Sequence, residues 1–142
     1  MLTTIEKVIF LQDVDIFNQI PSEDLAFIAH VTEEITVAPE TDIYKEGELS
    51  DSMYLVLTGK IRLHRGGLDV MVAGAKDVFG TWALFDAETR VVTATALEES
   101  RLLRIDKESF LDLLTDHGKI TEGLLKAMAS RLRGLMGRTE GR

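Results

Sequence analysis

Apolar positions recur at helical spacing near the start of the 142-residue chain. Their spacing predicts one helix over residues 3–11, and the polar break after it predicts a short turn over residues 13–17. Pro21 would end any earlier helix, and Ser22 is a good N-cap for a second one. We therefore expect a helical lead over residues 1–30. The apolar residues of its first helix are Ile5, Val8, Ile9 and Leu11.

From residue 31 to residue 105 the apolar positions change to a period of two, which is the spacing of β-strands. Turn residues separate the alternating segments, and Gly66-Gly67 is a good two-residue hairpin connection. About eight short strands at this spacing are typical of an antiparallel sandwich, barrel or jelly roll. The clearest strand candidates are TEEITVA, DSMYLVL, KIRLHR, LDVMVA, RVVTATALEES and RLLRIDK.

Helical spacing returns after the strands. Asp106 is a good N-cap for a helix in KESFLDLLTDHG, and Gly118 is expected to stop that helix. A longer helix follows in KITEGLLKAMASRLRGLM, so two helices are expected over residues 106–137. An apolar stripe along the second helix would serve either as core packing or as a homodimer seam. The stripe consists of Leu125, Met128, Leu132 and Leu135.

This order of elements predicts an α+β fold in a single domain over residues 1–142. Helices at both ends are segregated from an antiparallel roll of strands over residues 31–105. The length is ordinary for one domain, and the 45% hydrophobic fraction is that of a globular protein.

The charge balance bears on the partners that the chain could have. Twenty-four acids against sixteen Lys and Arg give a net charge of −8, which disfavours a surface that tracks nucleic-acid phosphates. Basic residues gather only near the C-terminus, in SRLRGLMGR, where they suit either a helix C-terminus or a partner contact. No apolar run is long enough for a membrane span, and the first residues do not resemble a secretory signal. We expect a cytoplasmic location.

Catalytic and metal-binding patterns are missing from the sequence. The histidines, His30, His64 and His117, lie at unrelated spacings, and the chain has no cysteine. Nucleophile elbow, Walker and dinucleotide motifs do not occur either. We therefore expect no catalytic residues, no metal, no cofactor and no enzymatic activity.

The segment FGTWALFDAETR, residues 79–90, suggests a binding site instead. Gly80 allows close backbone approach, and the residues after it could form one helical turn with unpaired N–H groups at its start. An arginine beside such donors, here Arg90, suits a phosphate group. The alternative is that Arg90 forms a surface ion pair with Asp86 or Glu88.

The same segment resembles the phosphate-binding cassette of cyclic nucleotide-binding domains, through Phe79-Gly80, Ala83-Leu84 and Arg90. The similarity continues from about Val14 to Leu135. A hairpin motif contributes to it through Glu46, Gly47, Asp51, Tyr54, Val56, Gly59 and Ile61. The resemblance implies an eight-stranded, jelly-roll-like β-roll with a helical lid, in which cyclic AMP or cyclic GMP is bound.

The resemblance also implies a set of ligand-binding residues. Arg90 would hold the cyclic phosphate, and Thr81 occupies the position of a glutamate that accepts a hydrogen bond from the ribose 2′-hydroxyl. A threonine is shorter and uncharged, so it weakens the ribose half of the site. The complete implied set is Phe79, Gly80, Thr81, Ala83, Leu84, Arg90, Val91 and Val92, of which Ala83, Leu84, Val91 and Val92 contribute through backbone N–H groups.

Two functions follow from these residues. The first is a regulatory domain that senses a cyclic nucleotide and acts on an unknown effector. The second is a relative that has lost this ligand and serves as an interaction or dimerisation module, or that binds another small phosphorylated ligand. Direct DNA binding is not expected, because no helix-turn-helix follows the long helix before Arg142.

Overall fold

The computed structural model describes the chain except for residues 82–84, 86–88 and 141–142 and the side chains of residues 138–140. The chain divides into two compact units. The roll unit comprises residues 31–110 with Met1, and the helical unit comprises residues 2–30 and 111–142. The prediction of a single domain over residues 1–142 stays a prediction.

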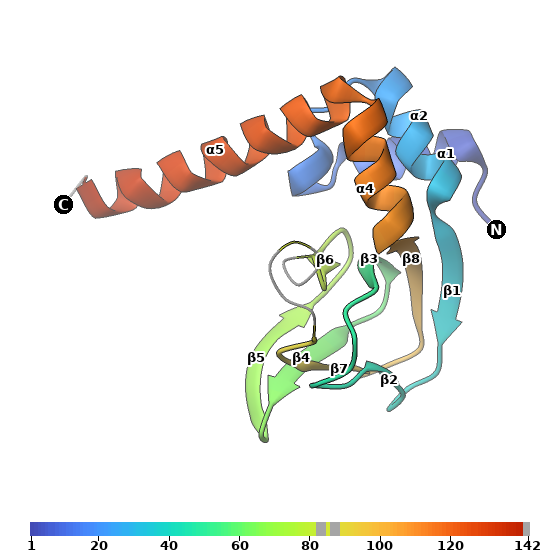
Figure 1. Cartoon of the computed structure of the whole chain (residues 1–142). Helices are drawn as coiled ribbons and strands as arrows, with labels where there is room; N and C mark the ends of the chain where they lie inside the picture. The colour runs from blue at the N-terminus through green and yellow to red at the C-terminus, as the bar shows by residue number, and fades with distance from the viewer. Residues whose placement is uncertain (82–84, 86–88, 141–142) are drawn as a thin grey trace. The chain divides into compact units, whose positions relative to one another are not determined.

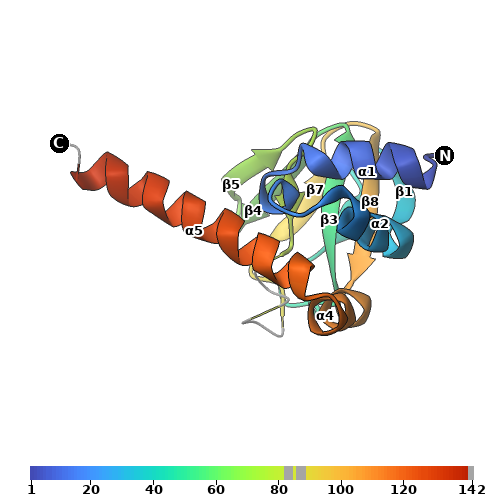
Figure 2. The same cartoon turned by 90° about the horizontal axis from the view of Figure 1, so that it is seen from above.

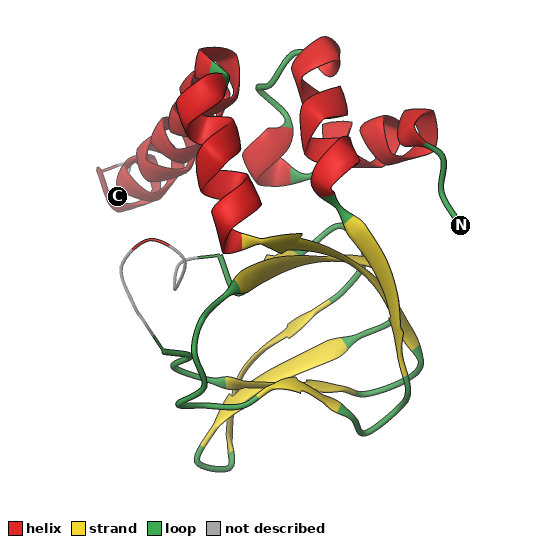
Figure 3. Ribbon diagram, turned by 45° about the vertical axis from the view of Figure 1, so that its right-hand side comes forward, coloured by secondary structure: helices red, strands yellow, loops and turns green. Residues whose placement is uncertain are grey.

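The roll unit contains eight antiparallel strands in two sheets (Figures 1 and 3). One sheet has the order β1-β8-β3-β6 and the other the order β2-β7-β4-β5, which confirms the predicted α+β fold with a β-roll. The strands are β1 (Glu33–Val37), β2 (Asp42–Tyr44), β3 (Ser52–Thr58), β4 (Ile61–Arg65), β5 (Leu68–Ala73), β6 (Val78–Phe79), β7 (Thr93–Ala96) and β8 (Ser100–Asp106).

The core of the roll lies between the two sheets, where the period-two apolar positions face inward. Tyr44, Tyr54 and Phe79 form an aromatic group within it, with centroids of Tyr54 and Phe79 5.2 Å apart. The Gly66-Gly67 turn joins β4 to β5 as predicted, with φ of 55° and 81°. This packing fixes the strand ends that carry the candidate site.

The helical unit contains the first helices of the chain and most of the last two. These elements are α1 (Thr4–Gln12), a 3-10 turn η1 (Asp15–Phe17), α2 (Ser22–Val31), α4 (Lys107–Asp116) and α5 (Gly118–Glu140). α4 begins in the roll unit, and α5 runs as one uninterrupted helix (Figure 2). Within the helical unit, a Cβ on Gly123 of α5 would lie 2.5 Å from Ile20, so a glycine is needed there.

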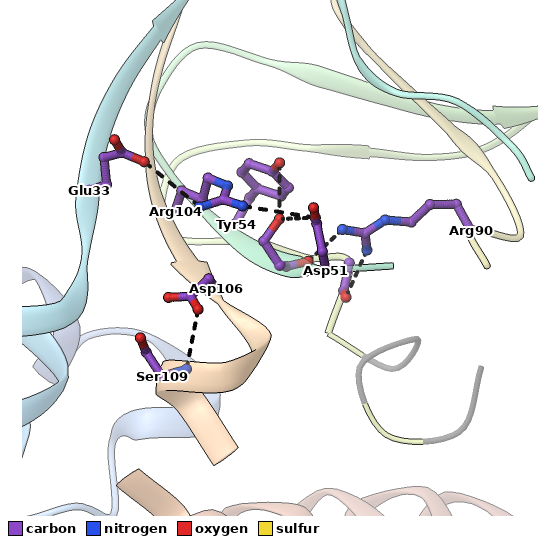
Figure 4. Close-up of polar contacts among 9 residues, drawn as sticks. Glu33, Asp51, Tyr54, Arg90, Arg104, Asp106 and Ser109 are labelled. Atoms are coloured by element: carbon purple, nitrogen blue, oxygen red, sulfur yellow. Dashed lines mark hydrogen bonds and ion pairs between the residues drawn. The ribbon is translucent and has the colours of Figure 1, made fainter. Parts of the chain in front are cut away.

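Two predicted helix boundaries are wrong and one is confirmed. Ser22 is the first residue of α2 rather than its cap, because the Pro21 carbonyl accepts from the N–H groups of Asp24 and Leu25. The Ser22 hydroxyl accepts from the Gln12 amide instead. Gly118 begins α5 instead of stopping α4, which ends at Asp116. The Asp106 cap is confirmed, because its carboxylate accepts from the Ser109 N–H at 3.3 Å, as Figure 4 shows.

Candidate functional site

Arg90 is tied to the preceding β2–β3 connection through its backbone. Its N–H donates to the Glu48 carbonyl at 2.8 Å, and its own carbonyl accepts from the Gly47 N–H at 2.8 Å. An isolated bridge pairs Leu49 with Thr89 beside these bonds. The expectation that Arg90 opens a strand is therefore wrong, because β7 begins only at Thr93 and Arg90 pairs locally with the connection.

The side chain of Arg90 is buried, with 3% of its surface exposed. One terminal nitrogen, Nη2, donates to the Ser52 carbonyl at 2.5 Å, and the other, Nη1, donates to the Gly80 carbonyl at 3.1 Å (Figure 4). The guanidinium carbon lies 4.0 Å from the centroid of the Tyr44 ring. These contacts fix the orientation of the guanidinium and leave its Nε without a partner among the described residues.

Gly80 gives the guanidinium the space that it occupies. Its φ of 79° lies in the left-handed region, which favours glycine. A Cβ at this position would lie 2.7 Å from Nη1 of Arg90. The glycine is therefore needed both for the backbone conformation and for the arginine.

The electrostatic surroundings of Arg90 are unusual for a buried cation. No carboxylate in the described part of the chain forms an ion pair with it. Burial raises the pKa of Tyr44 to about 12, although the nearby charge of Arg90 acts in the opposite direction. Tyr44 is therefore neutral at physiological pH and offers its ring face, not a phenolate. A buried cation whose described partners are all neutral is suited to binding an anion.

Comparison with known proteins agrees with this geometry. Residues 34–117 match the family described as the cyclic nucleotide-binding domain, and this range includes Gly80 and Arg90. The chain belongs to the cyclic nucleotide-binding domain family. The range also spans all eight strands except the first residue of β1. The resemblance of the chain to this family is thereby confirmed.

Three similar proteins illustrate the range of the family. A CRP-like cAMP-activated global transcriptional regulator of Mycobacterium tuberculosis is 31% identical over 96 residues, covering 64% of this chain and 43% of that protein. The cAMP/cGMP-dependent 3′,5′-cAMP/cGMP phosphodiesterase B of Dictyostelium discoideum is 30% identical, covering 69% of this chain and 10% of that enzyme. The N-terminal domain of a Streptomyces coelicolor transcriptional regulator aligns with a TM-score of 0.80 and 29% identity, covering 92% and 94% of the two chains.

The chain thus spans less than half the length of these curated relatives. The family includes regulators and an enzyme, so the expectation of no enzymatic activity stays a prediction for this member. None of the described helices has both the length and the apolar composition that crossing a bilayer would need.

The predicted ligand-binding residues differ in their relation to Arg90. Gly80 contacts it directly, and Thr81 follows Gly80 in the chain. Phe79 is buried in the aromatic core, Val91 is exposed, and Val92 packs partly against the core. Two predicted members, Ala83 and Leu84, lie outside the described residues, as do Trp82 and the alternative ion-pair partners Asp86 and Glu88. The assignment of these residues to a family ligand stays a prediction.

Three residues at the site are not among the predicted ligand-binding set. Tyr44 contributes its ring face and Ser52 its carbonyl, while Ser50 lies buried between Glu48 and Ser52 with its hydroxyl unpaired in the described structure. A backbone carbonyl leaves no signal in the sequence, because every residue has one. Tyr44 follows Ile43 in a short strand and looks like an ordinary core residue.

A second polar cluster of the roll unit contains Arg104, Glu33 and Asp51 (Figure 4). Arg104 lies 3.8 Å from the Glu33 carboxylate and 3.9 Å from that of Asp51. The Ser52 hydroxyl donates to the Asp51 carboxylate at 3.0 Å and lies at hydrogen-bond distance, 3.1 Å, from the Tyr54 hydroxyl, which can itself donate. Arg104 and Ser52 thus anchor Asp51 near the start of β3.

The histidines are distributed over different parts of the chain: His30 lies on α2, His64 on β4, and His117 between α4 and α5. His64 on β4 hydrogen-bonds the Thr95 hydroxyl at 2.8 Å, and His117 stacks on Phe27 with ring centroids 4.0 Å apart. His30 lies near the end of α2. No group of three metal-ligating side chains occurs within the part of the chain that the structure describes.

Proposed function

We propose that the chain is a regulatory module that senses a cyclic nucleotide, cyclic AMP or cyclic GMP, and that Arg90 holds the cyclic phosphate. One observation carries the proposal: a guanidinium with 3% exposure has no carboxylate partner among the described residues. Leaving a buried cation without a counter-ion is costly, and an anionic ligand offsets that cost. Membership of the cyclic nucleotide-binding domain family supports the same ligand class.

Calorimetric titration of the chain with cyclic AMP, cyclic GMP and adenosine tests this proposal. We expect saturable heat with at least one cyclic nucleotide and none with adenosine, because adenosine lacks the phosphate that Arg90 recognises. If neither cyclic nucleotide gives heat at millimolar concentration, the sensor function is wrong. Equal binding of adenosine would mean that the base, not the phosphate, is recognised.

The output of the module is proposed to be control of transcription, acting through another polypeptide or domain. Two similar proteins support this proposal, the Mycobacterium tuberculosis transcriptional regulator and the Streptomyces coelicolor regulator domain. The expectation that this chain does not itself contact nucleic acid agrees with its net charge of −8.

A second candidate function, dimerisation through α5, is favoured by its exposed apolar stripe. Leu125, Met128, Leu132 and Leu135 are each between 38% and 61% exposed. Their spacing of three, four and three residues is the a/d pattern of a coiled coil, so the proposed partner is α5 of a second copy. A chain that has lost its nucleotide would still dimerise through this surface.

Sedimentation equilibrium tests the dimer. We expect the wild-type chain to dimerise and Leu132→Glu to be monomeric, because a charge in the seam faces apolar side chains. Leu68→Glu, at an exposed leucine on β5, is the matched control and should sediment like the wild type. A monomeric wild-type chain, or dissociation by both substitutions, would contradict the proposed seam.

A further inference from the structure

Three buried side-chain atoms have no hydrogen-bond partner in the described structure: Ser50 Oγ, Thr81 Oγ1 and Arg90 Nε. Polar atoms in protein interiors are almost always paired, because a buried unpaired hydroxyl or N–H costs free energy. Elsewhere in the described roll, buried hydroxyls do have partners. Ser100 donates to the Glu98 carbonyl at 2.9 Å, and Thr95 donates to Asp42 at 2.6 Å.

All three unpaired atoms belong to segments that hold Arg90. Ser50 lies in the connection between Glu48 and Ser52, and both of these residues contact Arg90. The backbone N–H of Arg90 donates to the Glu48 carbonyl, and its Nη2 donates to the Ser52 carbonyl. Thr81 directly follows Gly80, whose carbonyl accepts from Nη1. The three unpaired atoms therefore belong to Arg90 itself and to the two segments that contact it (Figure 4 shows the contacts of the guanidinium).

The chemistry of these atoms indicates what would pair with them. The Arg90 Nε–H can only donate, and the two hydroxyls can each donate. The terminal nitrogens of the same guanidinium are already held by carbonyls. A single group that pairs with all three atoms needs several acceptor oxygens, and the guanidinium favours one with negative charge; a phosphate has both.

We propose that the hydroxyls of Ser50 and Thr81 join Arg90 Nε in holding the phosphate of the ligand. This inference rests on the proposed function and adds to it a ligand residue, Ser50, and a role for Thr81 toward phosphate. Neither hydroxyl is charged, so the guanidinium of Arg90 is the one charged group among these three proposed donors to the phosphate oxygens. Free inorganic phosphate has the same chemistry and is a second possible source of the group.

The ligand-free melting temperature of variants that lack each hydroxyl distinguishes a ligand role of that hydroxyl from a structural role. Ser50→Ala and Thr81→Val delete an unpaired buried hydroxyl, so the ligand-free melting temperature should stay the same or rise. Ser100→Ala is the matched control, since it deletes a buried hydroxyl that has a partner. It should lower the melting temperature and leave affinity unchanged.

The experiment is calorimetric titration of the wild type and these three variants with cyclic AMP, with cyclic GMP and, separately, with inorganic phosphate. We expect Ser50→Ala and Thr81→Val each to weaken binding about tenfold, the usual worth of one hydrogen bond to a charged group. If cyclic AMP binds and both variants match the wild type, the hydroxyl role is wrong while the sensor function survives.

The remaining outcomes separate the two proposals further. Binding of inorganic phosphate but of neither cyclic nucleotide, weakened by both substitutions, would support the donor set and overturn the cyclic nucleotide function. Binding of none of the three probes by the wild type would overturn both proposals. A fall in the ligand-free melting temperature of Ser50→Ala as large as that of Ser100→Ala would show that its hydroxyl is structural and would overturn its ligand role.

Discussion

Arg90 and Arg104 lie in the same roll but have opposite surroundings (Figure 4). The Arg104 side chain is 29% exposed and lies near two carboxylates, those of Glu33 and Asp51. Arg90 is almost fully buried and contacts two backbone carbonyls and an aromatic ring, with no carboxylate partner in the described residues. Among the described residues, the more deeply buried of these two cations is thus the one without a carboxylate partner.

Under the proposed function, this difference distinguishes an arginine that serves the fold from one that binds a ligand. A partly exposed ion pair contributes little to stability, because solvent screens it and two side chains lose freedom. A buried cation held by neutral groups is stable only because the fold positions those groups around it, and it keeps its full charge for a ligand. Residue type alone does not distinguish the two, whereas burial and the identity of the partners do.

The largest expected effect is on ligand affinity when the two arginines are compared directly. Arg90→Ala should weaken cyclic AMP binding by about 100-fold or more, because it removes a buried charged contact to the phosphate. Arg104→Ala should change the affinity by less than about threefold, since Arg104 pairs with carboxylates already present in the protein. Calorimetric titration of both variants measures the two affinities.

Urea unfolding provides the control for this comparison. Arg104→Ala should lower the free energy of unfolding by about 1 kcal/mol or less. Both variants must unfold cooperatively for the affinities to be compared. Equal losses of affinity in the two variants would mean that the distinction between them is wrong.

A smaller effect is expected when the space around Arg90 is filled. Gly80→Ala places a Cβ 2.7 Å from Nη1 of Arg90 at a residue with φ of 79°, so it should cost about 1–3 kcal/mol of unfolding free energy. Gly74→Ala is the matched control, because a Cβ there meets no atom within 4 Å. Urea unfolding of the two variants gives both values, and similar values would show that the arginine does not need this space.

The sequence predicted the roll well, because its signal is repeated. Strands such as β4 carry a period-two pattern of their own, and tight turns such as Gly66-Gly67 separate the strands, so one misread segment changes little. The prediction of each helix start, in contrast, depends on a single residue whose side chain can hydrogen-bond another partner instead of capping the helix. Ser22 bonds Gln12 instead of capping its helix, and nothing in the local sequence indicates this long-range bond.

The site was predictable only in part, for a physical reason. Gly80 and Arg90 could be singled out because a glycine and a lone arginine are distinctive residue types. The groups that orient Arg90 are the carbonyls of Ser52 and Gly80 and the ring of Tyr44, brought together by strands distant in sequence. Backbone carbonyls occur at every residue, so only the folded structure identifies which of them act.

The smallest expected effect is on the pH dependence of stability near Arg104, where the charged groups pair with one another within the protein. Hydrogen bonding from Ser109 lowers the pKa of Asp106 despite some desolvation, and the charge of Arg104 acts in the same direction. Since the folded state holds this proton less tightly than the unfolded state, the stabilisation is complete above the unfolded pKa of about 3.9. It is lost as the pH falls through the lower pKa of the folded state.

Asp106→Asn keeps a good helix cap but removes this titration. Its stability at pH 7 should match that of the wild type within roughly 0.5 kcal/mol, because the carboxylate is near the surface and its interactions are screened. Between pH 5 and pH 2 the wild type should lose slightly more stability than the variant, as measured by urea unfolding across this range. Asp112→Asn, at an exposed position within α4, is the control and should follow the wild type. A variant that loses stability as steeply as the wild type would show that the Asp106 carboxylate, unlike the Arg90 guanidinium, has no measurable energetic role.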